Sequence, residues 1–592
     1  MTLTGTGGES GDAKGVTARS VHEPAATPAP EPEPATTPAA GPEPATAAAP
    51  EPEPAAPAAP QPKRAAREPG SAAPAGPATA ARLRLPAALA VALAGGLALV
   101  AAFPPIGIWP LAPAGPALLA VALWRRGPGT SLLAGLAFGL AFFVPLLSWL
   151  LNVAWYAWLA LAASEAVIFA VLAVGQRLLL GLRAWPLAVA GWWVCAEALR
   201  ARWPYAFPWG RLAMSQAGTP AAPWAAIGGA PLLTFLVALV GTTLAWALLV
   251  PARRRAPLVP ARQRALLWLA PAAAIGLALA GSLLPVDRQV PGTPTATVAA
   301  VQGNVPHARD LPGLLRANTV TANHAAATER LAAQVRAGTR PAPDLVIWPE
   351  NSTDLDPGLY PQIYAKISAA VNAINRPVLV GALLADPVRN AGQLWLPGRG
   401  PVQTYLKRQL VPFGEYIPFR GLLKHITSLV NLQPQDFTAG HRAVVFRAGN
   451  IRLGDVICYE IGFDHLVSSE VNAGANLLAM QTNDATFEVD GQRGETLQQL
   501  AMARIRAVES NRAVVVASTT GVSAIIAPDG RLLARSGTWQ RAVLEARVPL
   551  VSQRTLADRL GSWPEAAIVA LTLLALAWAA IASPRRSRTA AR

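Results

Sequence analysis

Eight apolar stretches constrain this chain more than any other feature. A membrane-spanning helix needs about 20 consecutive apolar residues, and most of these stretches are that long. The composition agrees, with 52% hydrophobic and 14% charged residues and a mean hydropathy of +0.33. The sequence therefore predicts a multi-pass α-helical membrane bundle of about eight spans. The stretches lie at about 86–103, 107–124, 131–151, 157–176, 184–199, 224–250, 265–284 and 564–583.

Arginine clusters orient these predicted spans. Positive charge is enriched in cytoplasmic loops, and the clusters fall before the first stretch and after the second, fourth, sixth and eighth. Arg200 and Arg202, after the fifth stretch, are the exception. The pattern predicts both termini on the cytoplasmic side and residues 286–555 outside the cytoplasm. The clusters are Arg82 and Arg84, Arg125 and Arg126, Arg177 and Arg183, Arg253 to Arg255 with Arg262 and Arg264, and Arg585, Arg586 and Arg588.

Composition divides the chain further. Residues 1–80 are rich in Pro, Glu and Ala and cannot bury enough apolar surface to order themselves, so we expect a disordered cytoplasmic tail without a signal peptide. Residues 81–285 form the predicted membrane domain with about seven helices. Residues 286–555 form an outer domain, 563–583 a last span, and 584–592 a basic cytoplasmic tail.

The outer domain alternates short apolar runs with helical patterns, which indicates an α/β fold. The helical patterns are RANTVTANHAAATERLAAQVRAG and ETLQQLAMARIRAVESN. The predicted strands are TATVAAVQGN, DLVIWPE, PVLVGALL, RAVVFRA, DVICYE, NLLAMQTND, AVVVASTTG and SAIIAPDG.

The net charge of +16 does not indicate a nucleic-acid partner. The basic residues lie beside apolar runs, which is typical of membrane proteins, and nucleic-acid-binding motifs are absent from the sequence. The two cysteines, Cys195 and Cys458, are far apart, and the histidines are scattered. We therefore expect no disulfide framework and no metal site.

Three predicted strands end in residues that can do chemistry. LVIWPE ends in Glu350, TYLKRQLVPFGEYIP contains Lys407 and Glu415, and DVICYE ends in Cys458, Tyr459 and Glu460. A carboxylate can take the proton of a thiol, and an ammonium can stabilise the oxyanion that forms when the thiolate attacks a carbonyl. Each residue alone also has a structural interpretation: a core cysteine, a helix-start glutamate or a solvated lysine.

Together, WPE, KxxLVPFGEYIP and ICYE resemble the nitrilase, or carbon–nitrogen hydrolase, superfamily. FPWGRLAMSQ, VQGNVP, TNDATF and RAVESNR are similar to segments of its membrane branch, the apolipoprotein N-acyltransferase family. The resemblance covers about residues 85–583. It implies an extracytoplasmic αββα sandwich over the helical bundle, with no cofactor. The residues that it implies are Glu350 as general base, Lys407 as oxyanion stabiliser and Cys458 as nucleophile, with Glu415, Tyr459, Glu460 and Trp209 in supporting or substrate-binding roles.

The resemblance implies a double displacement at a bacterial plasma membrane. Cys458 takes an acyl chain from a phospholipid as a thioester, and the α-amino group of an S-diacylglyceryl cysteine on an apolipoprotein receives it. Partners are then membrane lipids and apolipoproteins, without nucleic acid, and a monomer is the simplest expectation. The high Ala, Arg and Pro content is typical of a high-GC organism such as an actinobacterium.

Two alternatives stay open at this point: a membrane-tethered amidase, which needs only one anchor, and a non-catalytic receptor or transporter. Asn351 and Thr486 depart from the family pattern and leave fine substrate preference open. FRGLLKHITSLVNLQP, after Glu415, is either a mobile lid or a packing helix. Glu165 and Glu197, inside apolar stretches, are expected to pair with polar neighbours or lie near span ends.

Overall fold

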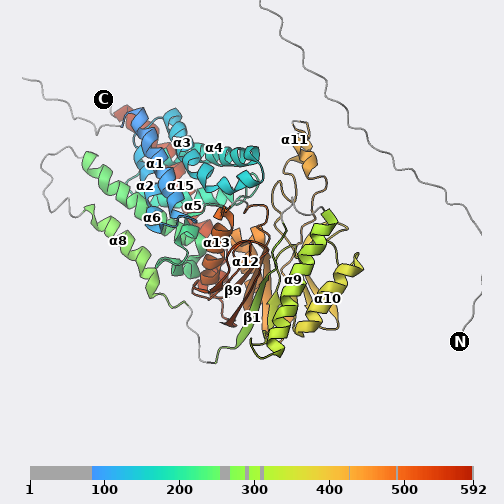
Figure 1. Ribbon diagram of the computed structural model, residues 1–592. Helices are drawn as coiled ribbons and strands as arrows, with labels where there is room; N and C mark the ends of the chain where they lie inside the picture. The colour runs from blue at the N-terminus through green and yellow to red at the C-terminus, as the bar shows by residue number, and fades with distance from the viewer. Residues whose placement is uncertain are drawn as a thin grey trace, which may run out of the picture. The chain divides into compact units, whose positions relative to one another are not determined.

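The computed structural model describes residues 83–253, 267–286, 292–306, 313–425, 427–488 and 491–589 (Figure 1). The proposed tail, residues 1–80, lies outside these ranges. An apolar helical region precedes the α/β region and is completed by the last helix of the chain. Its helices are α1 (Leu85–Ala102), α2 (Ala114–Leu123), α3 (Pro128–Leu146), α4 (Trp155–Leu179), α5 (Trp185–Arg200), α6 (Ala225–Arg253), α8 (Leu269–Leu279) and α15 (Trp563–Thr589).

Each of the eight predicted apolar stretches overlaps one of these helices. Among the described residues, five helices are long and apolar enough to cross a membrane: α1, α3, α4, α6 and α15. Helix α2 has 10 residues and α8 has 11, and at about 1.5 Å per residue each covers about half of a ~30 Å hydrocarbon layer. The count of eight spans therefore stays a prediction.

Small residues allow α3 and α4 to approach closely. A Cβ on Gly139 would lie 2.6 Å from the Ala166 Cα, and one on Gly135 would lie 2.5 Å from the Ala173 Cβ. The two glycines are four residues apart and share one face of α3. Contacts between such small residues replace the hydrophobic driving force that is absent between helices in lipid.

The α/β region contains two six-stranded sheets. The first has the order β12-β1-β2-β3-β4-β5, and the second has the order β11-β10-β9-β8-β7-β6. The first sheet is made of β1 (Thr295–Gln302), β2 (Leu345–Ile347), β3 (Val378–Leu384), β4 (Arg389–Leu396), β5 (Gly400–Leu406) and β12 (Ala542–Pro549). The second is made of β6 (Val445–Ala448), β7 (Ile451–Ile457), β8 (Leu477–Thr482), β9 (Val514–Ser518), β10 (Ala524–Ile526) and β11 (Leu532–Arg535).

Successive side chains of a strand point to opposite faces of its sheet, and the two faces pack against different layers in a four-layer sandwich. In β1, Val298 and Ala300 belong to the core shared by the two sheets, whereas Ala299 and Val301 pack with the outer helices, as the two-residue period of a strand requires. Helices α9 (Gly313–Arg336) and α10 (Pro361–Ile374) cover the first sheet, and α12 (Asp464–Asn472) and α13 (Gly494–Ser510) lie on the second. The predicted αββα class is confirmed.

The helical region and the second sheet share one apolar core. Phe142 of α3 and Trp193 of α5 belong to the same buried cluster as Met502 of α13 and Val456 of β7. The clustered side chains include Phe207, Trp209 and Tyr459, the residue that follows Cys458.

The glycine contact between α3 and α4 can be tested directly. We expect Gly139→Ala to lower Tm in detergent, because the added Cβ meets the α4 backbone and overpacking costs about 1–3 kcal/mol. Gly129→Ala, also in α3, is the matched control, since nothing lies within 4 Å of its Cβ position. Equal Tm values for the two variants would contradict the close packing.

Candidate active site

The chemically capable residues lie just beyond strand ends of both sheets. Glu350 follows β2 and Lys407 follows β5 in the first sheet, and Cys458 follows β7 in the second. Their exposed fractions are 5%, 1% and 7%. The structure therefore encloses in its interior three residues that the sequence placed on separate strands.

Lys407 is shared by two carboxylates. Its Nζ lies 2.9 Å from Glu350 Oε1 and 2.9 Å from Glu415 Oε1. The Asn390 amide donates to the same two oxygens, at 2.6 and 3.0 Å. Glu350 Oε2 accepts the Asn483 backbone N–H at 2.9 Å. The predicted proximity of Glu350, Lys407 and Glu415 is thus present in the structure, and Asn390 holds both carboxylates in place.

Burial and these charges set the protonation of the site. Burial raises the pKa of Glu350, and Lys407 only partly offsets that. Burial alone would lower the pKa of Lys407, but Glu350 and Glu415 raise it well above its ordinary value. Burial and Glu350 raise the pKa of the Cys458 thiol, against the lowering effect of Lys407. At rest the site therefore holds a neutral thiol beside a charged ammonium.

Cys458 occupies a strained turn. It begins a short 3₁₀ segment (Cys458–Gly462) directly after β7, and its φ is +54°. A side-chain-bearing residue in the left-handed region costs on the order of 1–3 kcal/mol, and such strain concentrates at functional sites. The Gln499 amide of α13 lies 3.5 Å from the sulfur.

The Glu460 carboxylate accepts hydrogen bonds that hold the Cys458 turn. Its carboxylate accepts the backbone N–H groups of Ile457 at 2.7 Å and of Arg408 at 2.7 Å. It also accepts the Gln409 N–H at 3.1 Å and the Tyr405 hydroxyl at 2.8 Å. These bonds join the Cys458 turn to the segment after Lys407.

Tyr459 and Trp209 stack with ring centroids 5.9 Å apart and planes 14° from parallel. The Tyr459 hydroxyl donates to the Ala206 carbonyl at 2.6 Å, and the Trp209 indole donates to Gln498 of α13 at 2.7 Å. Trp209 is 2% exposed and Tyr459 4%. Trp209, predicted from the membrane-domain segment, thus lies directly against the residue that follows Cys458.

The stretch considered as a lid, residues 419–434, contains a short helix, α11 (Arg420–Leu423), and a 3₁₀ turn (Ser428–Leu432), with residue 426 outside the described ranges. Phe419 and Leu422 are 60% and 63% exposed, whereas Val430 of the same stretch is 6% exposed. Its mobility stays a prediction.

The carboxylates inside the apolar helices are paired, as expected. Glu165 of α4 forms a buried ion pair with Arg200 of α5. Glu197 of α5 accepts the Leu212 N–H at 2.8 Å and the Thr234 hydroxyl at 2.7 Å.

Three polar residues of the site were not foreseen: Asn390, Asn483 and Gln499. Asn390 lies in a strand that the sequence did not predict, and Gln499 lies in the predicted helix ETLQQLAMARIRAVESN without any distinguishing neighbour. Asn483 alone had a signal, because it lies near the end of the predicted strand NLLAMQTND and within the TNDATF segment.

Comparison with known proteins agrees with this architecture. The model of the carbon–nitrogen hydrolase family matches residues 297–558, and that of the apolipoprotein N-acyltransferase N-terminal domain matches residues 95–243. The apolipoprotein N-acyltransferase of Mycolicibacterium smegmatis is 38% identical over 82% of this chain and 83% of its own length. That of Azotobacter vinelandii is 31% identical over 85% of this chain and 96% of its own. An amidase from Nesterenkonia has 15% identity, covers 46% of this chain and 95% of its own, and has a TM-score of 0.34.

The helical bundle and the two-sheet domain together define a membrane enzyme of the carbon–nitrogen hydrolase superfamily. Within that class, the chain belongs to the apolipoprotein N-acyltransferase family, and it is an acyltransferase.

The support that Glu460 gives to the turn leads to a stability test. We expect Glu460→Gln to lower the free energy of unfolding by about 2–3 kcal/mol, because an amide nitrogen cannot accept the bonds that the carboxylate accepts. Glu329→Gln, on the exposed face of α9, is the control and should leave Tm unchanged. A Tm for Glu460→Gln equal to that of the control would show that the four bonds are dispensable.

Proposed function

We propose that the protein moves an acyl chain from a membrane phospholipid, through a thioester on Cys458, to the α-amino group of the S-diacylglyceryl cysteine of apolipoproteins. The observation that carries the proposal is the buried Lys407, which Glu350 and Glu415 share and whose charge acts on the Cys458 thiol, in a chain of this family. That arrangement supplies a base, an oxyanion stabiliser and a nucleophile with no cofactor.

In the first half-reaction, Glu350 takes the thiol proton as the Cys458 sulfur attacks the ester carbonyl. The Lys407 ammonium stabilises the tetrahedral oxyanion, together with a backbone N–H of the turn. Collapse of the intermediate breaks the bond to the glycerol oxygen, which takes the proton from Glu350 and leaves as a lysophospholipid. The raised pKa of Glu350 suits it to receive and return one proton.

In the second half-reaction, the neutral α-amine attacks the thioester carbonyl. Glu350 takes a proton from the attacking nitrogen, the C–S bond breaks, and the thiolate recovers that proton. The product is an amide and the enzyme returns to its starting state. Low exposure of the site keeps water from hydrolysing the thioester between the two steps.

The topology we propose suits these substrates. Eight spans with both termini cytoplasmic would place the catalytic domain on the outer face of the plasma membrane. Each buried CH₂ is worth about 0.8 kcal/mol, so extracting a whole lipid would cost well over ~10 kcal/mol. A domain seated on its own spans reaches the ester and the amine while the acyl chains stay in the leaflet. Because Glu350, Lys407 and Cys458 come from one chain, we propose a monomer as the functional unit.

Intact-mass measurement tests the thioester. We expect the purified protein to gain one acyl mass after incubation with phospholipid vesicles, and to lose it when a diacylglyceryl-cysteine peptide is added. Cys458→Ala should gain no mass, and Cys195→Ala, which removes the other cysteine, should behave as wild type. Hydrolysis of small amides without any adduct would instead establish an amidase.

A substitution of the base separates proton transfer from binding. We expect Glu350→Gln to slow acylation of Cys458 by a factor of about 100 or more, because an amide keeps the shape of the side chain but cannot accept the thiol proton. Glu415→Gln should slow acylation less, since it alters the contacts of Lys407 and Asn390 but leaves the Glu350 carboxylate to accept the proton. Quenched-flow mass measurement gives both rates, and a wild-type rate for Glu350→Gln would rule it out as the base.

A further inference from the structure

The loop between α5 and α6, residues 201–224, packs against the turn that carries the nucleophile. Its Ala206 carbonyl accepts the Tyr459 hydroxyl, and its Trp209 ring stacks on Tyr459. A Cβ on Gly462 would lie 2.7 Å from Pro208 Cγ, so the loop touches the turn without a gap. We call this segment the α5–α6 loop.

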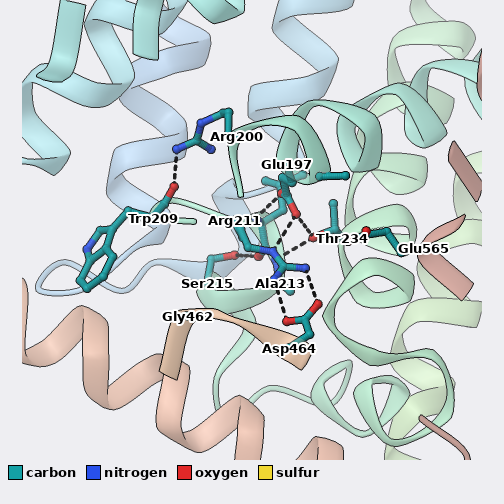
Figure 2. A network of polar contacts seen from close by, with 12 residues as sticks. Glu197, Arg200, Trp209, Arg211, Ala213, Ser215, Thr234, Gly462, Asp464 and Glu565 are labelled. Carbon is teal, nitrogen blue, oxygen red and sulfur yellow. Dashed lines mark hydrogen bonds and ion pairs between the residues drawn. The ribbon is translucent and has the colours of Figure 1, made fainter. Parts of the chain in front are cut away.

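Arg211 ties this loop to the residue that begins α12. Its guanidinium makes two parallel hydrogen bonds to Asp464, at 2.7 and 3.0 Å. The same guanidinium lies 3.4 Å from Glu197 of α5. Figure 2 shows Arg211 between these two carboxylates, one from the helical region and one from the catalytic domain. A bidentate contact fixes orientation as well as distance.

Asp464 is held from its other side by Arg506 of α13. Arg506 Nη2 lies 2.5 Å from Asp464 Oδ1. The same side chain donates to the carbonyls of Ile461 and Gly462, each at 3.0 Å. The backbone from Ile461 to Asp464 is therefore fixed within a few residues of Cys458.

The pairing is strong because the cations have no access to water. The Arg211 and Arg506 side chains are 4% and 0% exposed, whereas the Asp464 side chain keeps 27% exposure. Burial raises the pKa of Asp464, but Arg211 and Arg506 outweigh that and hold the pKa of this carboxyl well below its usual range. Removing the carboxylate would leave two cations that share it without their common partner.

We propose that Arg211 and Asp464 are positioning residues, through which the α5–α6 loop of the helical region holds the Cys458 turn in its strained, reactive geometry. Neither residue touches the reacting atoms. The role rests on the proposed acyl transfer. It predicts that loosening this contact slows the chemical step and leaves phospholipid binding intact, because a 1 Å misplacement of a reacting group costs about 100-fold in rate.

The test uses the full-length enzyme and its Asp464→Asn variant in nanodiscs of phosphatidylglycerol and phosphatidylethanolamine. Three quantities are measured: the rate of Cys458 acylation, the rate of Cys458 alkylation by iodoacetamide (located by peptide mapping), and Tm. We expect acylation to fall by about 10–100-fold with KM for phospholipid within about twofold, and alkylation to fall in parallel.

Asp558→Asn is the matched control. Asp558 is a buried carboxylate of α14 (Leu556–Leu560) that pairs with Arg512, two residues after the end of α13, and Arg512 lies outside the Cys458 turn. The proposal holds if this control loses at least as much Tm as Asp464→Asn but keeps its acylation rate. It is overturned if Asp464→Asn reacts at the wild-type rate, or if both variants slow in proportion to their loss of Tm.

Two further measurements cover the cases in which Asp464→Asn does not fold or no acyl adduct forms. If Asp464→Asn does not fold, Arg211→Lys retains the charge with a single contact, and a wild-type acylation rate in that variant overturns the proposal. If the wild-type enzyme never forms an acyl adduct, the proposed function fails on its own. The alkylation rates of the variant and of the Asp558→Asn control then decide the positioning role separately.

Discussion

One buried ammonium organises the candidate site at one end of the sandwich. Lys407 follows β5 of the first sheet, is 1% exposed, and pairs with two carboxylates that would be costly to bury without a cation. Cys458 arrives from the second sheet, with the Lys407 charge acting on its sulfur. The site therefore exists only where the two sheets are stacked, and the inter-sheet core of residues such as Val298, Ile347 and Ile457 is what sets that stacking.

Buried cations paired with carboxylates are also found at the junction with the helical region. Arg200 pairs with Glu165, and Arg211 is shared by Glu197 and Asp464. A hydrophobic junction of similar volume could be equally stable. Ion pairs add orientation, because a bidentate contact tolerates little rotation. This is a physical reason for a chain with so few charges to place several of them at one buried junction.

The sequence predicted the strands that end in reactive residues, because short apolar runs with β-branched residues, such as DVICYE, are typical of buried strands. It did not find β4, β11 and β12, and of β5 it found only the TYL end that precedes Lys407. RNAGQLWL and GPVQTYL mix Gly, Pro and polar residues, and they are strands only because neighbouring strands complete their hydrogen bonds. Asn390 was missed with β4. The Arg211–Asp464 contact joins residues 253 positions apart, a separation over which neither periodicity nor motif spacing carries information.

That separation also bears on how the chain is made. The ribosome adds roughly 5–20 residues per second, so Arg211 is synthesised on the order of 10–50 seconds before Asp464 exists to bind it. During that interval the α5–α6 loop has Glu197 but lacks the surface of Tyr459, Gly462 and Asp464 against which it finally lies. The helices of the bundle are therefore made before the surface that covers the α5–α6 loop. The loop reaches its final packing only after the domain that contains Asp464 has been translated and has folded.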